Sequence, residues 1–167
     1  MAAARGQFEK WQVKSVDVRR QLGMSQDARP WTSRPGVLLR GLAKTPRVLD
    51  VLDCCFEHAR QQSPLLAIPE LIRGLYCNPS QAVDRLPVSR TASTFSSSLS
   101  QYSFEKDCLL SSEAGLLFSG WGRRMMPLEV FTEAELSSLC GDCFSVPIPA
   151  QVLTAFFLNN HYGVWWR

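Results

Sequence analysis

The sequence predicts a mixed α/β fold, mostly helices with a few short strands, that forms part of a domain. Apolar residues recur at helical spacing behind capping signals, first over residues 46–61. Short runs near residues 11–18 and 102–104 have the alternation or the aromatic content of strands. The chain lacks the Gly-rich turn that follows the first strand of a doubly wound cofactor-binding sheet. We therefore expect a partial domain and not a complete doubly wound sheet.

The N-terminal segment, residues 1–44, is polar, basic and interrupted by glycine and proline, which indicates irregular structure. One short strand is expected near residues 11–18, where Trp11, Val13 and Ser15 would share a face. Residues 5–47 hold ten Lys and Arg against three Asp and Glu. Such a stretch forms a solvated face, a loose arm or a set of phosphate contacts.

The first helix is expected over residues 46–61. Thr45 can cap it, and Pro46 suits the first turn because its missing N–H would be unpaired there. A second, shorter helix is expected over residues 68–75. The apolar stripe of the first helix consists of Val48, Val51, Leu52, Cys55 and Ala59.

Residues 76–101 change character and predict a turn followed by a loop. Asn78-Pro79-Ser80 is a turn signal, and the stretch from Ser93 to Ser100 is rich in serine. The aromatic run Tyr102-Ser-Phe104 follows at once and predicts a strand that enters a structured region.

The last 60 residues predict three helices. One begins near Ser111-Ser112-Glu113 and stops near Gly120. Thr132-Glu-Ala-Glu135 is a capping box, and the helix that it opens ends at Gly141. The third helix spans about residues 147–159, and the tail 161–167 either packs on the core or has no partner in this chain.

The six cysteines predict free buried thiols, because no secretory signal precedes them. Cys140-Gly-Asp-Cys143 has the spacing of a redox motif or of half a zinc site, which leaves a small redox or zinc protein as an alternative. No run approaches the roughly 18 uncharged apolar residues of a membrane span. We expect a nuclear or cytoplasmic protein without a membrane segment.

Three segments, in order, resemble the end of a DNA cytosine-5 methyltransferase. Gly141-Asp-Cys-Phe-Ser-Val-Pro-Ile-Pro149 is similar to the last conserved motif of that family, which opens the C-terminal helix. Residues 102–121 resemble the segment in which an aromatic strand leads to a helix with an early glutamate. Residues 80–98 resemble the stretch after the target-recognition region, where Ser-Gln and Arg precede a Thr- and Ser-rich run.

The resemblance implies a helical and Ser-rich target-recognition-like region over residues 45–101, a C-terminal motif region over 102–160 and a tail over 161–167. It implies DNA as a partner. Phosphate contacts favour Arg, amide and hydroxyl side chains. The candidates for contact with the DNA backbone are Gln81, Arg85, Arg90 and Thr91.

The resemblance also implies the edge of an S-adenosylmethionine pocket, formed only when a catalytic half completes the chain. Asp142 stands where the family has Asn or Arg, and an acid beside the carboxylate of the cofactor would weaken binding. The expected edge consists of Asp142, Cys143, Phe144 and Ser145.

Catalytic residues of the family are missing from this chain. Methylation of cytosine at C5 requires a thiolate that attacks C6, and the family carries it in a Pro-Cys pair with a Glu-Asn-Val segment nearby. Neither motif occurs here. We therefore expect a chain that is inactive alone: a truncated, degenerate or split member of the family.

A noncatalytic interaction subunit is the alternative from another functional class. It would dock, against a catalytic methyltransferase half or another subunit, through the aromatic C-terminal helix and tail. The residues that would form this surface are Phe156, Phe157, Trp165 and Trp166.

Overall fold

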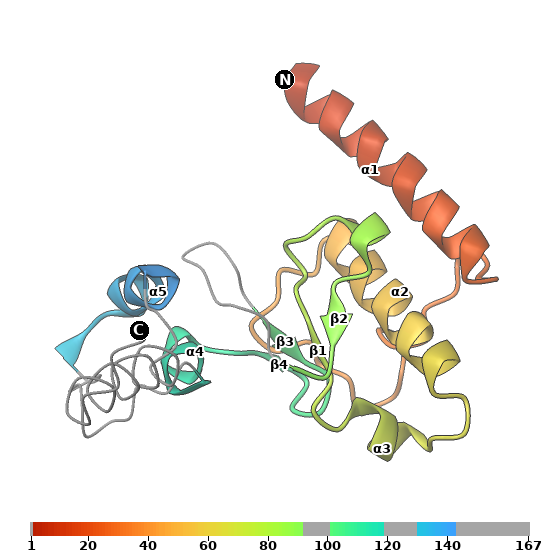
Figure 1. Cartoon of the computed structure of the whole chain (residues 1–167). Helices are drawn as coiled ribbons and strands as arrows, with labels where there is room; N and C mark the ends of the chain where they lie inside the picture. Colours follow the sequence, from red (N-terminus) through yellow and green to blue (C-terminus); the bar gives the residue numbers. More distant parts are fainter. Residues whose placement is uncertain (1, 92–100, 119–129, 143–167) are drawn as a thin grey trace, which may run out of the picture. The chain divides into compact units, whose positions relative to one another are not determined.

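The computed structural model describes residues 2–91, 101–118 and 130–142. The described residues fall into two compact units: unit 1 runs up to Leu110, and unit 2 begins at Ser111. Together they contain helices and one small antiparallel sheet (Figure 1), so the expectation of a mixed α/β chain is confirmed. No helix within these described ranges is long and apolar enough to cross a bilayer.

Residues 2–21 of the N-terminal segment form a helix, α1 (Ala2–Gln21), so the strand expected near residues 11–18 is wrong, whereas residues 22–44 are irregular, as expected. Its buried positions are Ser15, Val18 and Arg19, and Leu22, directly after the helix, continues the same face. Two of these four side chains are polar, so the buried face does not appear in the sequence as an apolar stripe at helical spacing.

A buried ion pair joins α1 to α2 (Pro46–Gln62), the central helix of unit 1. Arg19 Nε donates to Asp50 Oδ1 at 2.6 Å, and the hydroxyl of Ser15 donates to the same carboxylate. Arg19 is 3% exposed and Asp50 is 3% exposed. The guanidinium of Arg19 also donates to the carbonyls of Ser25 and Ala28, at 3.0 and 2.9 Å. One buried cation therefore holds α1, the following loop and α2 together.

The expected first helix is confirmed as α2. Thr45 Oγ1 accepts from the backbone N–H of Val48 at 3.4 Å, and Pro46 occupies the first turn. The helix is flanked by the rest of unit 1 (Figure 1), and its apolar side chains enter the core. The five positions expected to be buried are all buried: Val48, Val51, Leu52, Cys55 and Ala59.

The second expected helix is shorter than predicted. It spans α3 (Ile68–Ile72) and gives way to a turn in which Gly74 has a φ of +61°, a left-handed conformation that glycine adopts without steric cost.

A four-stranded antiparallel sheet follows, in the order β2-β1-β3-β4. The strand expected at 102–104 is confirmed as β3. The other three were not predicted. β1 pairs with β3, so the regions expected over 45–101 and 102–160 share one sheet. The strands are β1 (Tyr76–Cys77), β2 (Val88–Ser89), β3 (Tyr102–Ser103) and β4 (Cys108–Leu109).

An aromatic cluster in the core of unit 1 carries a chain of hydrogen bonds. The ring of Trp31 lies 5.1 Å from that of Phe104 and 5.2 Å from that of Phe56, measured between centroids. Trp31 Nε1 donates to the Tyr102 hydroxyl at 3.0 Å, and that hydroxyl donates to Asp107 Oδ1 at 2.6 Å. The polar tips of the large rings are thus paired inside the core.

Asp53, on α2, is fully buried and accepts three hydrogen bonds. Its Oδ1 accepts from the backbone N–H groups of Trp31 and Thr32, both at 2.9 Å, and its Oδ2 accepts from Thr32 Oγ1 at 2.7 Å. Burial raises the pKa of this carboxyl, whereas the hydrogen bonds and the nearby Arg29 lower it. The carboxylate fixes the backbone that carries Trp31.

Unit 2 contains α4 (Ser112–Phe118) and α5 (Glu133–Asp142). The capping box is confirmed: Glu135 accepts from the backbone N–H of Thr132 at 2.8 Å, and Thr132 Oγ1 accepts from that of Glu135 at 3.4 Å. α5 runs one residue beyond the expected end at Gly141. The helix expected over 147–159 and the tail lie outside the described residues.

Three thiols of unit 1, Cys54, Cys55 and Cys77, are buried and free, as expected. Burial, with the nearby Asp50, raises the pKa of Cys54 to about 12. Burial and the thiol of Cys77 raise the pKa of Cys55. Since the thiolate is the reactive form, Cys54 and Cys55 are protected both by burial and by their raised pKa, and Cys77 is protected by burial.

Alkylation of the native protein should therefore modify Cys108, which is half-buried, well before these three. We expect labelling of Cys54, Cys55 and Cys77 at pH 8 to be at least about 100-fold slower than that of Cys108. Mass spectrometry of peptides after timed iodoacetamide treatment measures the rates, and treatment in denaturant equalises them. Rapid native labelling of Cys55 would contradict the buried placement of α2.

Candidate binding site

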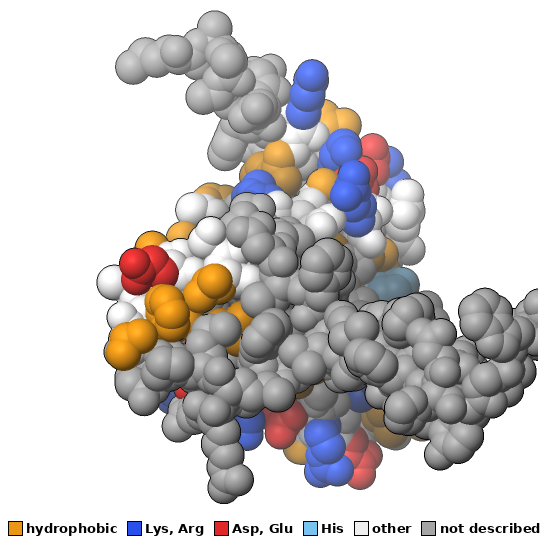
Figure 2. Space-filling model, turned by 60° about the vertical axis from the view of Figure 1, so that its left-hand side comes forward, with side chains coloured by type: hydrophobic (Ala, Val, Ile, Leu, Met, Phe, Trp, Pro, Cys, Tyr) orange, Lys and Arg blue, Asp and Glu red, His pale blue; other side chains and the backbone are white. Residues whose placement is uncertain are grey.

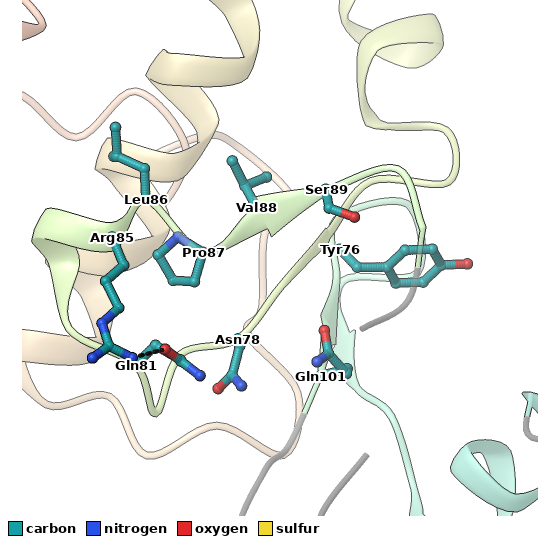
Figure 3. Close-up of a pocket in the computed structure, with 9 residues that line it drawn as sticks. All are labelled: Tyr76, Asn78, Gln81, Arg85, Leu86, Pro87, Val88, Ser89 and Gln101. Atoms are coloured by element: carbon teal, nitrogen blue, oxygen red, sulfur yellow. Dashed lines mark hydrogen bonds between the residues drawn. The ribbon is translucent and has the colours of Figure 1, made fainter. Parts of the chain in front are cut away.

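Unit 1 carries a pocket of about 270 Å³, which we call the carboxamide slot (Figure 3). It is built from β1, β2, the residue before β3 and a single 3₁₀ turn, η1 (Val83–Arg85). All of these elements belong to one sheet or to the connection between two of its strands. The lining residues are Tyr76, Asn78, Gln81, Arg85, Leu86, Pro87, Val88, Ser89 and Gln101.

The turn expected at Asn78-Pro79-Ser80 is present and shapes the floor of the slot. Asn78 Oδ1 accepts from the backbone N–H of Ser80 at 3.0 Å, and the backbone N–H of Asn78 donates to the Pro87 carbonyl at 3.0 Å. Arg47, from α2, donates to the carbonyls of Pro79 and Gln81, each at 3.2 Å. The loop is therefore held from both sides.

One edge of the slot carries three carboxamides, those of Gln81, Asn78 and Gln101, in a row (Figure 3). Asn78 is 4% exposed and Gln101 is 2% exposed. Asn78 Nδ2 makes no hydrogen bond to any residue that the structure describes. A buried amide donor without a partner is costly, about 1–3 kcal/mol, and marks a place where a ligand acceptor would fit.

The opposite edge is apolar and consists of Leu86, Pro87 and Val88 (Figure 3). Leu86 has a φ of +42°, in the left-handed region that a non-glycine residue rarely adopts. This conformation ends η1 and turns the chain into β2. Arg85 lies at one end of the slot and Tyr76 at the other.

The slot has a positive border. Arg85 is exposed and its Nη1 donates to Gln81 Oε1 at 3.2 Å. Asp84, the one acid between residues 76 and 91, is paired with Lys14 Nζ at 2.7 Å, which lowers the pKa of its carboxyl. Lys and Arg side chains also group on the upper part of the surface seen in Figure 2. Because Asp84 is engaged by Lys14, the charge of the exposed Arg85 guanidinium remains available to an anionic ligand.

Two of the four predicted DNA-contact residues line the slot, and two lie beside it in the sequence. Gln81 and Arg85 line the slot, and Arg90 and Thr91 directly follow Ser89, another lining residue. Thr91 N–H donates to Ser89 Oγ at 2.9 Å, and Arg90 Nη1 donates to the Arg73 carbonyl at 3.0 Å. Both Arg90 and Thr91 are exposed.

The predicted cofactor edge falls mostly outside the described residues. Asp142 is the last residue of α5, in unit 2, and Cys143, Phe144 and Ser145 lie beyond it. The docking surface predicted for an interaction subunit also lies outside. Within the described ranges, no group of three or more His, Cys, Asp or Glu side chains could hold a metal ion.

Of the nine residues that line the slot, sequence reasoning named only Gln81 and Arg85 as candidates; the polar and aromatic side chains that it missed include Asn78, Gln101 and Tyr76. Asn78 lies in the turn that the sequence predicts. Its amide donor lacks a partner among the described residues because of how the strands pack around it, and the sequence does not reveal that packing. Gln101 stands directly before the predicted aromatic strand, and this position could have indicated that its side chain lies at the edge of the sheet. Comparison of the chain with family models, with curated proteins and with solved structures finds no match.

Proposed function

We propose that the chain is a noncatalytic DNA-binding module, a catalytically incomplete relative of the DNA cytosine-5 methyltransferases. One observation supports this proposal: two of the four residues predicted to contact DNA, Gln81 and Arg85, line the slot, and the other two, Arg90 and Thr91, directly follow its lining residue Ser89. The motif resemblance implies DNA as the partner, and the side-chain types at the slot support DNA binding independently.

Phosphate binding is the first part of the proposal. Arg85 and Arg90 are exposed, and a hydroxyl at Thr91 and an amide at Gln81 accompany them. These are the side-chain types that hold the sugar-phosphate backbone and position a protein on DNA. Asp84, the nearby acid, forms an ion pair with Lys14, which partly offsets its repulsion of an approaching phosphate.

Methyl transfer is not part of the proposal. The thiols of Cys54, Cys55 and Cys77 are buried with no route to a base, and burial raises the pKa of Cys54 and Cys55. In the resemblance, Asp142 stands where the family has Asn or Arg, and an acid beside the carboxylate of S-adenosylmethionine would weaken its binding. The cofactor would bind only in an enzyme completed by a catalytic half.

Fluorescence anisotropy with a labelled oligonucleotide tests DNA binding. We expect Kd values in the range of roughly 1–100 µM at physiological salt, and log K that falls linearly with log salt concentration. Arg85→Gln and Arg90→Gln should each weaken binding and reduce the salt slope by about 1, because each removes one phosphate contact.

Arg60→Gln is the matched control. It also removes one guanidinium from an exposed position, but Arg60 lies 13 residues along α2 from Arg47, about 20 Å at 1.5 Å per residue. Its salt slope should equal that of the unmodified chain. Equal losses in all three variants would indicate a nonspecific charge effect, and absence of binding at low salt would contradict the proposed function.

A further inference from the structure

We infer that the carboxamide slot admits one unpaired nucleobase, so that the module binds single-stranded DNA in preference to duplex. This inference rests on the proposed function and specifies its ligand. It depends on the size of the slot, its unpaired donor, its two walls and the positions of its cations.

The size of the slot fits a single flat ring system. Its volume is about 270 Å³, just below the range of about 300–1,000 Å³ that accommodates drug-sized ligands. A dinucleotide would not fit, and a lone ion would leave the apolar wall without contact. The carboxamide edge and the apolar edge lie on opposite sides of the slot (Figure 3), so a ring system with a polar rim and apolar faces matches its lining.

The unpaired donor on Asn78 selects the chemistry of the ligand. Because Asn78 Oδ1 is committed to the N–H of Ser80, the free end of the amide is Nδ2, a donor. Every nucleobase offers an acceptor on a ring nitrogen or a carbonyl oxygen, and Asn and Gln side chains pair with base edges. A base acceptor at Asn78 would remove the cost of the buried donor.

The walls of the slot provide apolar contact and a stacking face. Tyr76 is half-buried at one end, and Pro87 and Val88 line the edge opposite Asn78. Stacking of a base on an aromatic side chain contributes about 1–3 kcal/mol and tolerates any sequence. A peptide on the free edge of β2 would instead pair with its backbone, and would need neither the Asn78 amide nor the Tyr76 ring.

The cations lie where phosphates on either side of an inserted base would pass. Arg85 stands at one end of the slot, and Arg90 follows Ser89 at the end marked by Tyr76. A base in a duplex is stacked and paired, and its extraction costs a few kcal/mol. The slot should therefore favour a strand whose bases are already free.

The test compares a labelled 12-nucleotide single strand with the matched duplex, by anisotropy at one salt concentration. Asn78→Ser removes the donor yet keeps an oxygen that can accept from Ser80 N–H. Tyr76→Leu keeps an apolar side chain and removes the stacking face. We expect single-strand affinity to fall about 5- to 10-fold for Asn78→Ser and about 5- to 100-fold for Tyr76→Leu.

Duplex affinity should stay within about 2-fold for both variants, whereas Arg85→Gln should weaken single-strand and duplex binding alike. Circular dichroism and the unfolding midpoint establish that each variant is folded, and two different substitutions guard against misfolding of one. Equal affinity of the unmodified chain for both DNA forms would overturn the inference, as would slot variants with unchanged single-strand affinity. Either result would leave DNA binding itself intact, whereas absence of binding to both DNA forms would contradict the proposed function itself.

Discussion

Asp50→Asn is expected to lower the free energy of unfolding by about 3–5 kcal/mol, because it leaves a buried cation without its counter-charge. Arg19 is 3% exposed and lies against Asp50 between α1 and α2. The substitution keeps the shape of the side chain and one acceptor oxygen, so the loss reports the charge. Guanidinium denaturation followed by far-UV circular dichroism measures it, with the slope unchanged if folding stays two-state.

Two comparisons isolate the buried pair. Asp17→Asn removes the exposed partner of Arg20 on the same helix, at 3.0 Å and with both side chains more than half exposed, and should cost less than about 1 kcal/mol. The double variant Arg19→Met, Asp50→Leu should recover only part of the lost stability, since an apolar pair carries no desolvation cost but the carbonyls of Ser25 and Ala28 lose their donor. A loss for Asp50→Asn no larger than for Asp17→Asn would contradict the buried placement.

The same pair explains why the sequence did not predict α1. Helix α2 was predictable because its signals are local: a capping threonine, a proline in the first turn and an apolar stripe. In α1 the buried face includes Ser15 and Arg19, and their partner Asp50 lies 31 or more residues away. A polar residue that is buried by a distant partner has no periodic signature.

Of the sheet, only the strand with aromatic residues was predictable from the sequence. Each strand is two residues long, too short to display an alternating pattern. β3 was found through Tyr102 and Phe104. β1 and β2 flank the predicted Asn78-Pro79-Ser80 turn, and only their pairing across the chain makes them strands.

The slot, too, was only partly predictable from the sequence. Arg85 and Gln81 were candidates because their side-chain types suit phosphate contact, and the structure places both in the pocket. Asn78 and Gln101 come from segments 23 residues apart in sequence. Their adjacency in one wall follows from the pairing of β1 with β3, which no local pattern encodes.

Asp53→Ala is expected to cost about 3 kcal/mol, because it leaves two backbone donors inside the protein without acceptors. Each unsatisfied buried donor costs about 1–3 kcal/mol. The two donors belong to Trp31 and Thr32, and the hydroxyl of Thr32 loses its acceptor as well. Guanidinium denaturation gives the stability, and near-ultraviolet circular dichroism reports the packing of the Trp31 ring.

A graded series separates the hydrogen bonds from the carboxylate charge. Asp53→Asn keeps one oxygen for both N–H groups and should cost only about 1 kcal/mol, as should Thr32→Val, which removes the hydroxyl alone. Equal losses for Asp53→Asn and Asp53→Ala would assign the effect to the charge near Arg29 and contradict the hydrogen-bond account. Because Trp31 Nε1 reaches Tyr102 in β3, the loss for Asp53→Ala should be global: the α2 and sheet signals should unfold together.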